Sequence, residues 1–287
     1  MTINDLSAFG GLDADIRAAL LAQVRDLWTH GSTAIEGNTL TLGETKFVIE
    51  EGLTVSGKPL KDHQEVVGHA RAIELLYHWL DEGFTDDKLF DLHRAIQTEV
   101  VRDIDKPCGA WKREPNGTYA ITADGRQNFI EYADPRDVPE LMSQWCAELN
   151  RLSRDGLSEV DAITAYVHLH LGFVHIHPFW DGNGRLARLL SNLPLLRSGH
   201  LPLVIDVKDR KRYIDILAEY QLTVGRLVPQ EGVWPSPELQ RPFLAFCEAS
   251  YAATRALVSG ARTQQAKRRR PSTQPARAST QTGAPDG

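Results

Sequence analysis

A twelve-residue stretch at positions 177–188 brings together the residue types that could do chemistry in this chain. It reads His-Pro-Phe-Trp-Asp-Gly-Asn-Gly-Arg-Leu-Ala-Arg. The Asp-Gly-Asn-Gly turn lies between two helical patterns, and a turn of this kind points successive backbone N–H groups into one concavity. The positive end of the following helix reinforces that concavity as an anion site. The stretch therefore predicts an anion-binding turn at the start of a helix.

The side chains of the stretch extend this prediction to a reaction. Arg185 and Arg188 lie three residues apart on the first turn of the expected helix, and two guanidinium groups there suit a polyphosphate. Asp181 is a hard carboxylate of the kind that Mg²⁺ takes beside phosphate oxygens. His177 is the type of side chain that takes a proton near neutral pH. Alone, each residue is more typical of a surface or a core position, but together they predict phosphoryl or nucleotidyl transfer.

A second segment, residues 32–38, could act on this site. Thr33 and Glu36 have the spacing of a capping box, which opens a helix. Gly37 and Asn38 follow directly, however, so a helix is predicted to end here. A glutamate at the end of a helix faces the negative pole of the macrodipole and should seek a cation. Arg188 is one candidate partner for Glu36.

The elements that must position these residues are predicted to be helices. Apolar residues recur at helical spacing in most of the chain, and Gly31 is predicted to break the first helix. Between Pro107 and Pro135 the helical period is lost, and turn residues predict a small hairpin or flap at about 115–125. The expected helices cover residues 13–28, 46–51, 60–82, 85–96, 137–153, 158–175, 184–199 with a kink at Pro194, 209–224 and 237–258. The fold class is therefore all-α with a β-hairpin.

Composition agrees with a globular protein. Of 287 residues, 42% are hydrophobic and 24% are charged, which is an ordinary mixture. No signal peptide or membrane span is predicted, and the three cysteines are far apart, so a soluble cytoplasmic protein without a disulfide framework is expected. His168, His170 and His175 do not share one helix face as a zinc site would need, and they are predicted to be core residues.

Three regions are expected along the chain. Residues 1–52 form N-terminal helices that include the segment 32–38, residues 53–258 form the core, and residues 261–287 form a disordered basic tail. The tail carries a net charge of +5, which leaves −11 on the rest. A body with that charge has no overall basic footprint for nucleic acid, although the tail could make weak, salt-sensitive contacts with nucleic acid or acidic proteins.

The stretch 177–188 resembles the signature of the Fic family, His-x-Phe-x-(Asp/Glu)-Gly-Asn-Gly-Arg-x-x-Arg, and every specified position matches. The likeness extends over roughly residues 30–250. It implies a Fic-type helical bundle with a β-hairpin flap, which transfers AMP from Mg·ATP to a Ser, Thr or Tyr hydroxyl of a target protein.

The resemblance also implies roles for single residues. His177 would be the general base, Asp181 the Mg²⁺ ligand, and Arg185 and Arg188 the groups that hold the phosphates. Tyr213 would lie near the adenine, although Tyr220 stands where the family often has an asparagine. The remaining ATP-binding positions would be Gly182, Asn183 and Gly184, which form the anion hole, with Leu186 and Ala187. The flap residues would be Tyr119, Ala120, Ile121 and Thr122.

The segment 32–38 matches the inhibitory motif of the same family, (Ser/Thr)-x-x-x-Glu-(Gly/Asn), at Ser32, Glu36 and Gly37. Its position is that of the subclass with an N-terminal inhibitory helix. The resemblance implies that Glu36 pairs with Arg188, displaces the γ-phosphate and leaves ATP in an unproductive pose.

The implied partners are ATP and an unidentified target protein, and the resemblance allows self-modification and a homodimer, with no membrane partner. Other functions stay open. The same site could remove AMP from a modified protein, with Glu36 orienting a water, or transfer another phosphate-containing group. From a different class, the chain could be a nucleotide-binding regulatory module or a nucleic-acid-binding module.

Overall fold

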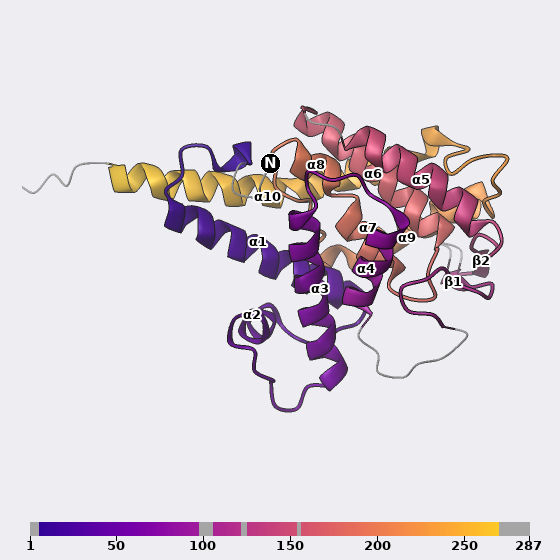
Figure 1. The fold of residues 1–287 in the computed structure, drawn as a ribbon, viewed down its shortest axis with the longest axis horizontal. Coiled ribbons are helices and arrows are strands. Elements are labelled where there is room, and N and C mark those ends of the chain that lie inside the picture. Colours follow the sequence, from indigo (N-terminus) through magenta and orange to yellow (C-terminus); the bar gives the residue numbers. More distant parts are fainter. Residues whose placement is uncertain (1–5, 98–105, 122–124, 154–155, 270–287) are drawn as a thin grey trace, which may run out of the picture.

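The computed structural model describes residues 6–97, 106–121, 125–153 and 156–269 (Figure 1). Within these ranges the fold consists of helices and a two-stranded antiparallel sheet, which confirms the predicted fold class. No helix there combines the length and apolar character that a membrane span needs. The helices are α1 (Ala14–Ile35), α2 (Leu42–Glu51), α3 (Leu60–His78), α4 (Asp86–Ile96), α5 (Val138–Leu152), α6 (Glu159–Ile176), α7 (Asn183–Leu190), α8 (Leu193–Arg197), α9 (Arg210–Val224) and α10 (Arg241–Arg269). Short 3₁₀ turns cover Ser7–Phe9, Val207–Asp209 and Pro237–Gln240.

Helix α6 is the buried centre of the fold. Of its 18 residues, 13 are buried, because its sequence is apolar on nearly every side and such a helix is stable only when surrounded. Ser158 caps its start by accepting the backbone N–H of Asp161, and the Trp145 indole on α5 donates to the Leu169 carbonyl at 2.8 Å. The last residue of the helix is followed directly by His177, so this rigid element places the predicted base.

Helix α1 differs from its prediction, because it continues through Gly31 to Ile35. The glycine is buried, and a Cβ atom there would collide with the carbonyl oxygen of Ile205. Gly31 therefore permits close packing and does not break the helix. The helix ends as predicted, with Glu36 at the C-cap and Gly37 at a positive φ of 101°, and the Arg210 guanidinium donates to the Ile35 carbonyl.

The helix expected over 184–199 is also different, since it is divided into α7 and α8. The break lies at Ser191 and Asn192, ahead of the expected kink at Pro194. The Asn192 side chain accepts the Leu203 N–H at 2.7 Å and donates to the carbonyls of Leu203 and Arg188. Asn192 thus binds both the end of α7 and the segment at Leu203 where the helix is interrupted. Pro194 lies in the first turn of α8.

Helix α10 corrects the prediction that disorder begins at residue 261. It continues to Arg269 and lies beside α1 (Figure 1). Gln265 is buried and accepts the Asp13 N–H at 2.7 Å, and Arg268 pairs with Asp15 at 2.6 Å. These contacts with the start of α1 give the polar segment partners that its composition did not reveal. The predicted tail beyond Arg269 lies outside the described residues.

The sheet consists of β1 (Gly117–Ile121) and β2 (Gln127–Glu131), in a register that places Tyr119 opposite Phe129. The inner face carries Ala120 and Ile130, which pack with Tyr132 against α9. The hairpin was predicted in this region, and it is attached to the helical body close to α9 (Figure 1).

Candidate active site

His177 ends α6 in an unusual backbone conformation. Its φ is 53° and its ψ is 59°. Among the residues that the structure describes, every other residue with a positive φ is a glycine. A side chain in this region costs on the order of 1–2 kcal/mol, and such strain tends to occur at functional positions. The ring lies flat against Tyr132, with ring centroids 3.7 Å apart and planes 3° apart. The backbone therefore turns the imidazole away from the helix and onto the base of the flap.

The protonation of His177 suits a general base. Its Nδ1 lies 3.3 Å from the Val174 carbonyl oxygen, which can only accept, so Nδ1 carries the proton and Nε2 is left as an acceptor. Burial of the ring, and next the charge of Lys112, lower the pKa of His177 to about 3, whereas the Val174 carbonyl and Asp181 act in the opposite direction. The ring is therefore neutral at physiological pH.

The turn after His177 is held by its own asparagine. The Asn183 side chain accepts the Phe179 N–H and donates to the Phe179 carbonyl, both at 2.9 Å. Gly182 has a φ of 80° and is the N-cap of α7, a conformation that a residue with a Cβ rarely adopts. The predicted turn at the start of a helix is therefore present, with the first N–H groups of α7 at its edge; its binding of an anion stays a prediction.

His93 on α4 supports the same turn, and the sequence did not single it out. Its Nδ1 accepts the Gly109 N–H at 2.8 Å, so Nε2 carries the proton and donates to the Asp181 carbonyl at 3.1 Å. The ring stacks on Phe179 with centroids 4.0 Å apart. Burial lowers the pKa of His93 to about 4, so this arrangement persists at neutral pH.

Arg185 and Asp181 lie at the mouth of the turn. The Arg185 guanidinium is buried, and its Nη2 is 3.1 Å from Asp181 Oδ2. Glu65 on α3 is a second acidic neighbour, 3.8 Å from Arg185 Nη1. The Asp181 side chain is 52% exposed. A buried cation and a half-exposed carboxylate are thus adjacent; their contacts with phosphate and Mg²⁺ stay predictions.

Arg188 is buried and makes four hydrogen bonds to its own chain. Its Nε and Nη2 donate to the Ser32 hydroxyl at 3.1 Å and to the Ser32 carbonyl at 2.8 Å. Nη2 also donates to Glu36 Oε1 at 2.7 Å, and Nη1 donates to the Tyr213 hydroxyl at 3.2 Å. The predicted pair of Glu36 and Arg188 is therefore present, across 152 residues of sequence.

The Glu36 carboxylate lies where an anion would be bound. A Cβ atom on Gly184 would collide with Glu36 Oε1, so this oxygen is directly against the first turn of α7. The positive pole of that helix favours a negative charge at this point. The Glu36 side chain is 39% exposed, so part of it faces solvent.

Tyr213 is a core residue in this structure. It is 1% exposed, and its hydroxyl lies between Arg188 Nη1 and His170 Nε2, 3.1 Å from the latter. Burial keeps the pKa of His170 well below its usual range, so the neutral ring accepts from the tyrosine. The observed contact of Tyr213 is with the arginine, and a contact with adenine stays a prediction.

The flap presents an apolar outer face beside the site. Tyr119, Ile121 and Phe129 are 65%, 75% and 54% exposed. The alternation of strands places them on the face opposite Ala120 and Ile130. Thr122, predicted as part of the flap, lies outside the described residues. The role of these residues in aligning a target stays a prediction.

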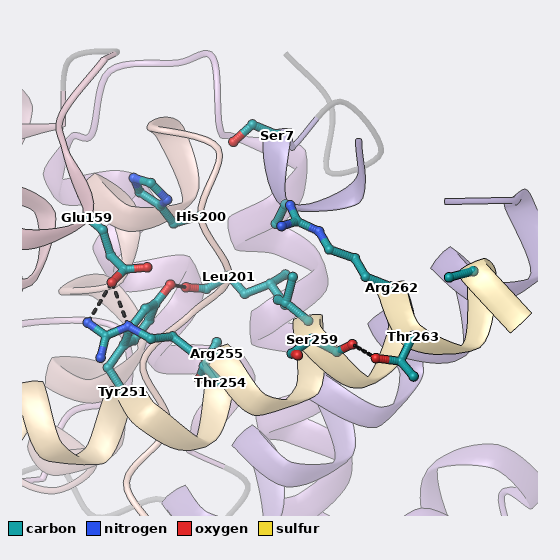
Figure 2. Close-up of a pocket in the computed structure, with 13 residues that line it drawn as sticks. Ser7, Glu159, His200, Leu201, Tyr251, Thr254, Arg255, Ser259, Arg262 and Thr263 are labelled. Atoms are coloured by element: carbon teal, nitrogen blue, oxygen red, sulfur yellow. Dashed lines mark hydrogen bonds and ion pairs between the residues drawn. The ribbon is translucent and has the colours of Figure 1, made fainter. Parts of the chain in front are cut away.

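A cavity of about 510 Å³ lies elsewhere, along α10 (Figure 2). Its walls include Glu159, Arg255 and Tyr251, and none of its lining residues belongs to the stretch 177–188. Arg255 pairs with Glu159 at 2.6 Å, and the Tyr251 hydroxyl donates to the Leu201 carbonyl at 3.0 Å. Because these polar groups are satisfied within the chain, the chemistry is assigned to the site around His177.

Residues 83–195 match the model of the Fic/DOC family. The protein adenylyltransferase fic-1 of Caenorhabditis elegans is 33% identical over 192 residues, which cover 65% of this chain and 35% of that protein. The protein adenylyltransferase Fic of Nematostella vectensis is 33% identical over 191 residues, covering 66% and 41%. The chain thus spans between a third and two fifths of the length of these curated relatives.

Two solved structures are similar over most of the chain. A Fic-domain-containing signaling protein from Bacteroides thetaiotaomicron has a TM-score of 0.74 and 28% identity, covering 88% of this chain and 92% of that one. Fic-1 of C. elegans, residues 134–508, has a TM-score of 0.64 and 25% identity, covering 91% and 69%. The similarity therefore includes the helices on both sides of the matched domain.

Proposed function

This chain is a member of the Fic/DOC family, and from that premise we propose that it is a protein adenylyltransferase restrained by Glu36. It would transfer AMP from Mg·ATP to a Ser, Thr or Tyr hydroxyl of a target protein. The observation that carries the proposal is a neutral His177 that directly precedes the turn at the start of α7, with Arg185 and Arg188 within that helix.

The reaction follows from this arrangement. The target hydroxyl attacks the α-phosphorus, an O–P bond forms, the bond from the α-phosphorus to its bridging oxygen breaks, and pyrophosphate leaves. The proton of the hydroxyl passes to His177 Nε2, the nitrogen that the Val174 contact leaves unprotonated. The first N–H groups of α7 and the two guanidinium groups stabilise the negative charge on the phosphates.

The residues present fit the Mg²⁺ that the family implies. Mg²⁺ in nucleotide sites takes one or two protein carboxylates together with phosphate oxygens and waters. Asp181 supplies one carboxylate that is half exposed at the mouth of the turn, and the described residues hold no cluster of three or more His, Cys, Asp and Glu side chains. The metal would therefore arrive with ATP and be held by Asp181, where it supplies neutralisation of phosphate charge.

The proposed restraint acts through Arg188. The terminal phosphate of ATP needs a free guanidinium edge, and Nη2 of Arg188 is engaged by Glu36. Glu36 also lies against Gly184, on the surface that the phosphates would cover. Glu36 and the γ-phosphate would then compete for one position, and ATP bound beside Glu36 would be misaligned.

Transfer of labelled phosphate tests the proposal. The Glu36→Gly variant is incubated with native cell extract and with ATP labelled at either the α- or the γ-phosphate. The background is the same extract with the double variant Glu36→Gly/His177→Ala. Above this background, we expect Glu36→Gly to add protein labelling from the α-position and none from the γ-position. Added labelling from the γ-position would indicate phosphoryl transfer, and α-labelling by the double variant above that of extract alone would refute His177 as the general base.

Removal of AMP is a second candidate, favoured by one observation. The Glu36 side chain is 39% exposed, so its carboxylate can contact a water as well as Arg188. A water oriented there could attack an AMP group on a modified protein. If wild type but not Glu36→Gly releases AMP from a labelled target, this second activity is present.

A further inference from the structure

Lys112 is a buried charge next to the candidate base. It is 2% exposed and precedes the flap, in a segment with no helical or strand pattern. Burial of an ammonium group is costly unless the surroundings provide partners. A lysine kept at such a position therefore requires a physical reason.

The contacts of Lys112 join two parts of the site. Its backbone N–H donates to the Pro178 carbonyl at 2.9 Å, and its Nζ donates to Asn116 Oδ1 at 2.6 Å. Asn116 in turn donates to the Phe179 carbonyl at 3.1 Å. One lysine thus connects the segment that leads into the flap with the turn that follows His177.

A second route runs through Tyr132, at the other end of the flap. Lys112 Nζ lies 5.9 Å from the centroid of the Tyr132 ring, close enough for a cation–π attraction. The same tyrosine ring stacks on the His177 ring, with centroids 3.7 Å apart. The Tyr132 N–H also donates to the Asn116 carbonyl. Both ends of the flap therefore meet at Lys112.

The charges around the base act in opposite directions. Lys112 lowers the pKa of His177, second only to burial, while Asp181 raises it. Burial lowers the pKa of Lys112 itself to about 7, and Asp134 opposes that change. Tyr132 is neutral between the two, because burial and then the charge of Glu36 raise its pKa to about 12. Below neutral pH the ammonium is thus the cation that opposes protonation of His177.

We propose that Lys112 is a positioning residue for the transfer: its buried ammonium joins the base of the flap to the signature turn and repels a proton from the His177 ring. This proposal rests on the proposed function, since it assigns Lys112 a part in that reaction. Lys112 does not touch the reacting atoms, and it acts through His177 and the flap.

Two variants separate the two parts of the role. Lys112→Met keeps the volume but removes both the charge and the donor, and Asn116→Ala removes the acceptor while leaving the charge. Lys112→Met removes the desolvation cost of a buried ammonium, and the group that loses its partner, Asn116 Oδ1, is neutral, so the variant is expected to fold. Lys112→Leu is the second uncharged variant, and circular dichroism at each pH records the fold.

The first measurement is the NMR titration of the His177 ring in the full chain without ligands, from pH 8 to 4.5, with the signal assigned from His177→Asn. Loss of a neighbouring cation is expected to raise the pKa of His177 by on the order of one unit. From a starting value of about 3, the protonated fraction at pH 4.5 would rise from about 3% to about a quarter. Asn116→Ala should titrate like wild type. A protonated fraction of His177 at pH 4.5 that equals the wild-type value in both uncharged variants would overturn the electrostatic part.

The second measurement is amide hydrogen exchange of residues 117–121 and 127–131. We expect exchange several-fold faster than wild type in both Lys112→Met and Asn116→Ala, because each removes the bond between Lys112 and Asn116. If these residues exchange as slowly in both variants as in wild type, the proposal that Lys112 joins the flap to the signature turn is overturned. Neither measurement needs ATP or a target, so a failure of AMP transfer in Glu36→Gly would refute the proposed function and leave these results to decide on Lys112.

Discussion

Replacement of Glu36 gives the sharpest test of how the site is regulated. Glu36→Gly removes the carboxylate that engages Arg188 Nη2 at 2.7 Å. Arg188 keeps its bonds to the Ser32 hydroxyl, the Ser32 carbonyl and the Tyr213 hydroxyl, so the buried guanidinium is not left unpaired. The substitution lies at the helix C-cap, next to Gly37, where glycine is tolerated. The variant is therefore expected to fold.

The size of the effect follows from the pair. A hydrogen bond between charged groups contributes about 1.5–3 kcal/mol. Because the Glu36 side chain is 39% exposed, screening by solvent reduces this to about 1–2 kcal/mol. That free energy corresponds to a factor of about 5 to 30. Glu36→Gly should raise the initial rate of α-label transfer by this factor, and Glu36→Gln, which keeps an acceptor without the charge, should have an intermediate rate.

Nucleotide binding supplies the matched control. If Glu36 competes with the terminal phosphate, ATP affinity measured by calorimetry should rise in Glu36→Gly, whereas ADP affinity should stay unchanged because ADP lacks that phosphate. Equal transfer rates in wild type and Glu36→Gly would refute the restraint. An equal gain for ATP and ADP would show that Glu36 acts on the whole site and not at the γ-position.

Three further predictions concern the pH dependence of the transfer rate, the pH dependence of stability and the packing around Gly31. In the Glu36→Gly background, protonation of His177 should not lower the transfer rate as pH falls from 8 to 5, because the pKa of His177 is about 3. A transfer rate that falls with a midpoint near pH 6.5 would contradict this. Burial lowers the pKa of His69 to about 3 and of His93 and His175 to about 4, so the unfolded chain binds more protons than the folded one below pH 6.5. Stability should therefore decrease from pH 7 to pH 5 by up to about 2 kcal/mol per buried histidine, measured by denaturant unfolding, and equal midpoints at both pH values would count against it. Gly31→Ala should lower the free energy of unfolding by about 1–3 kcal/mol, because its Cβ meets the Ile205 carbonyl. Gly43→Ala lies in open space on α2 and should raise it by about 0.4–1 kcal/mol. Thermal unfolding measures both changes.

The parts of the site that the sequence predicted are those whose residues are contiguous or lie at a helix end. Arg185 and Arg188 were placed by helical spacing alone, and Glu36 was paired with a cation because the end of a helix is unfavourable for a carboxylate. The end of the helix before Gly37 was predicted because glycine and asparagine commonly follow the last residue of a helix. These inferences needed no knowledge of the tertiary fold.

The parts that the sequence did not reveal depend on contacts between distant segments. Lys112 and His93 approach the turn from a loop and from α4, and no spacing relates them to His177. The same is true of Gly31, whose neighbour is the Ile205 carbonyl, and of Gln265, which binds the start of α1. Local propensity predicts a break or disorder at such positions, and tertiary packing overrides it.

The four acceptors around Arg188 differ in how easily they can be exchanged. Ser32 and Tyr213 are buried at 2% and 1% exposure, while the fourth acceptor, Glu36, opens to solvent. Activation would thus replace one acceptor of the Arg188 guanidinium, while the other three acceptors stay in place. The resting protein would hold its transfer machinery preassembled, and the step that frees Arg188 would be the rotation of one glutamate side chain, a motion that takes about picoseconds to nanoseconds for an exposed residue.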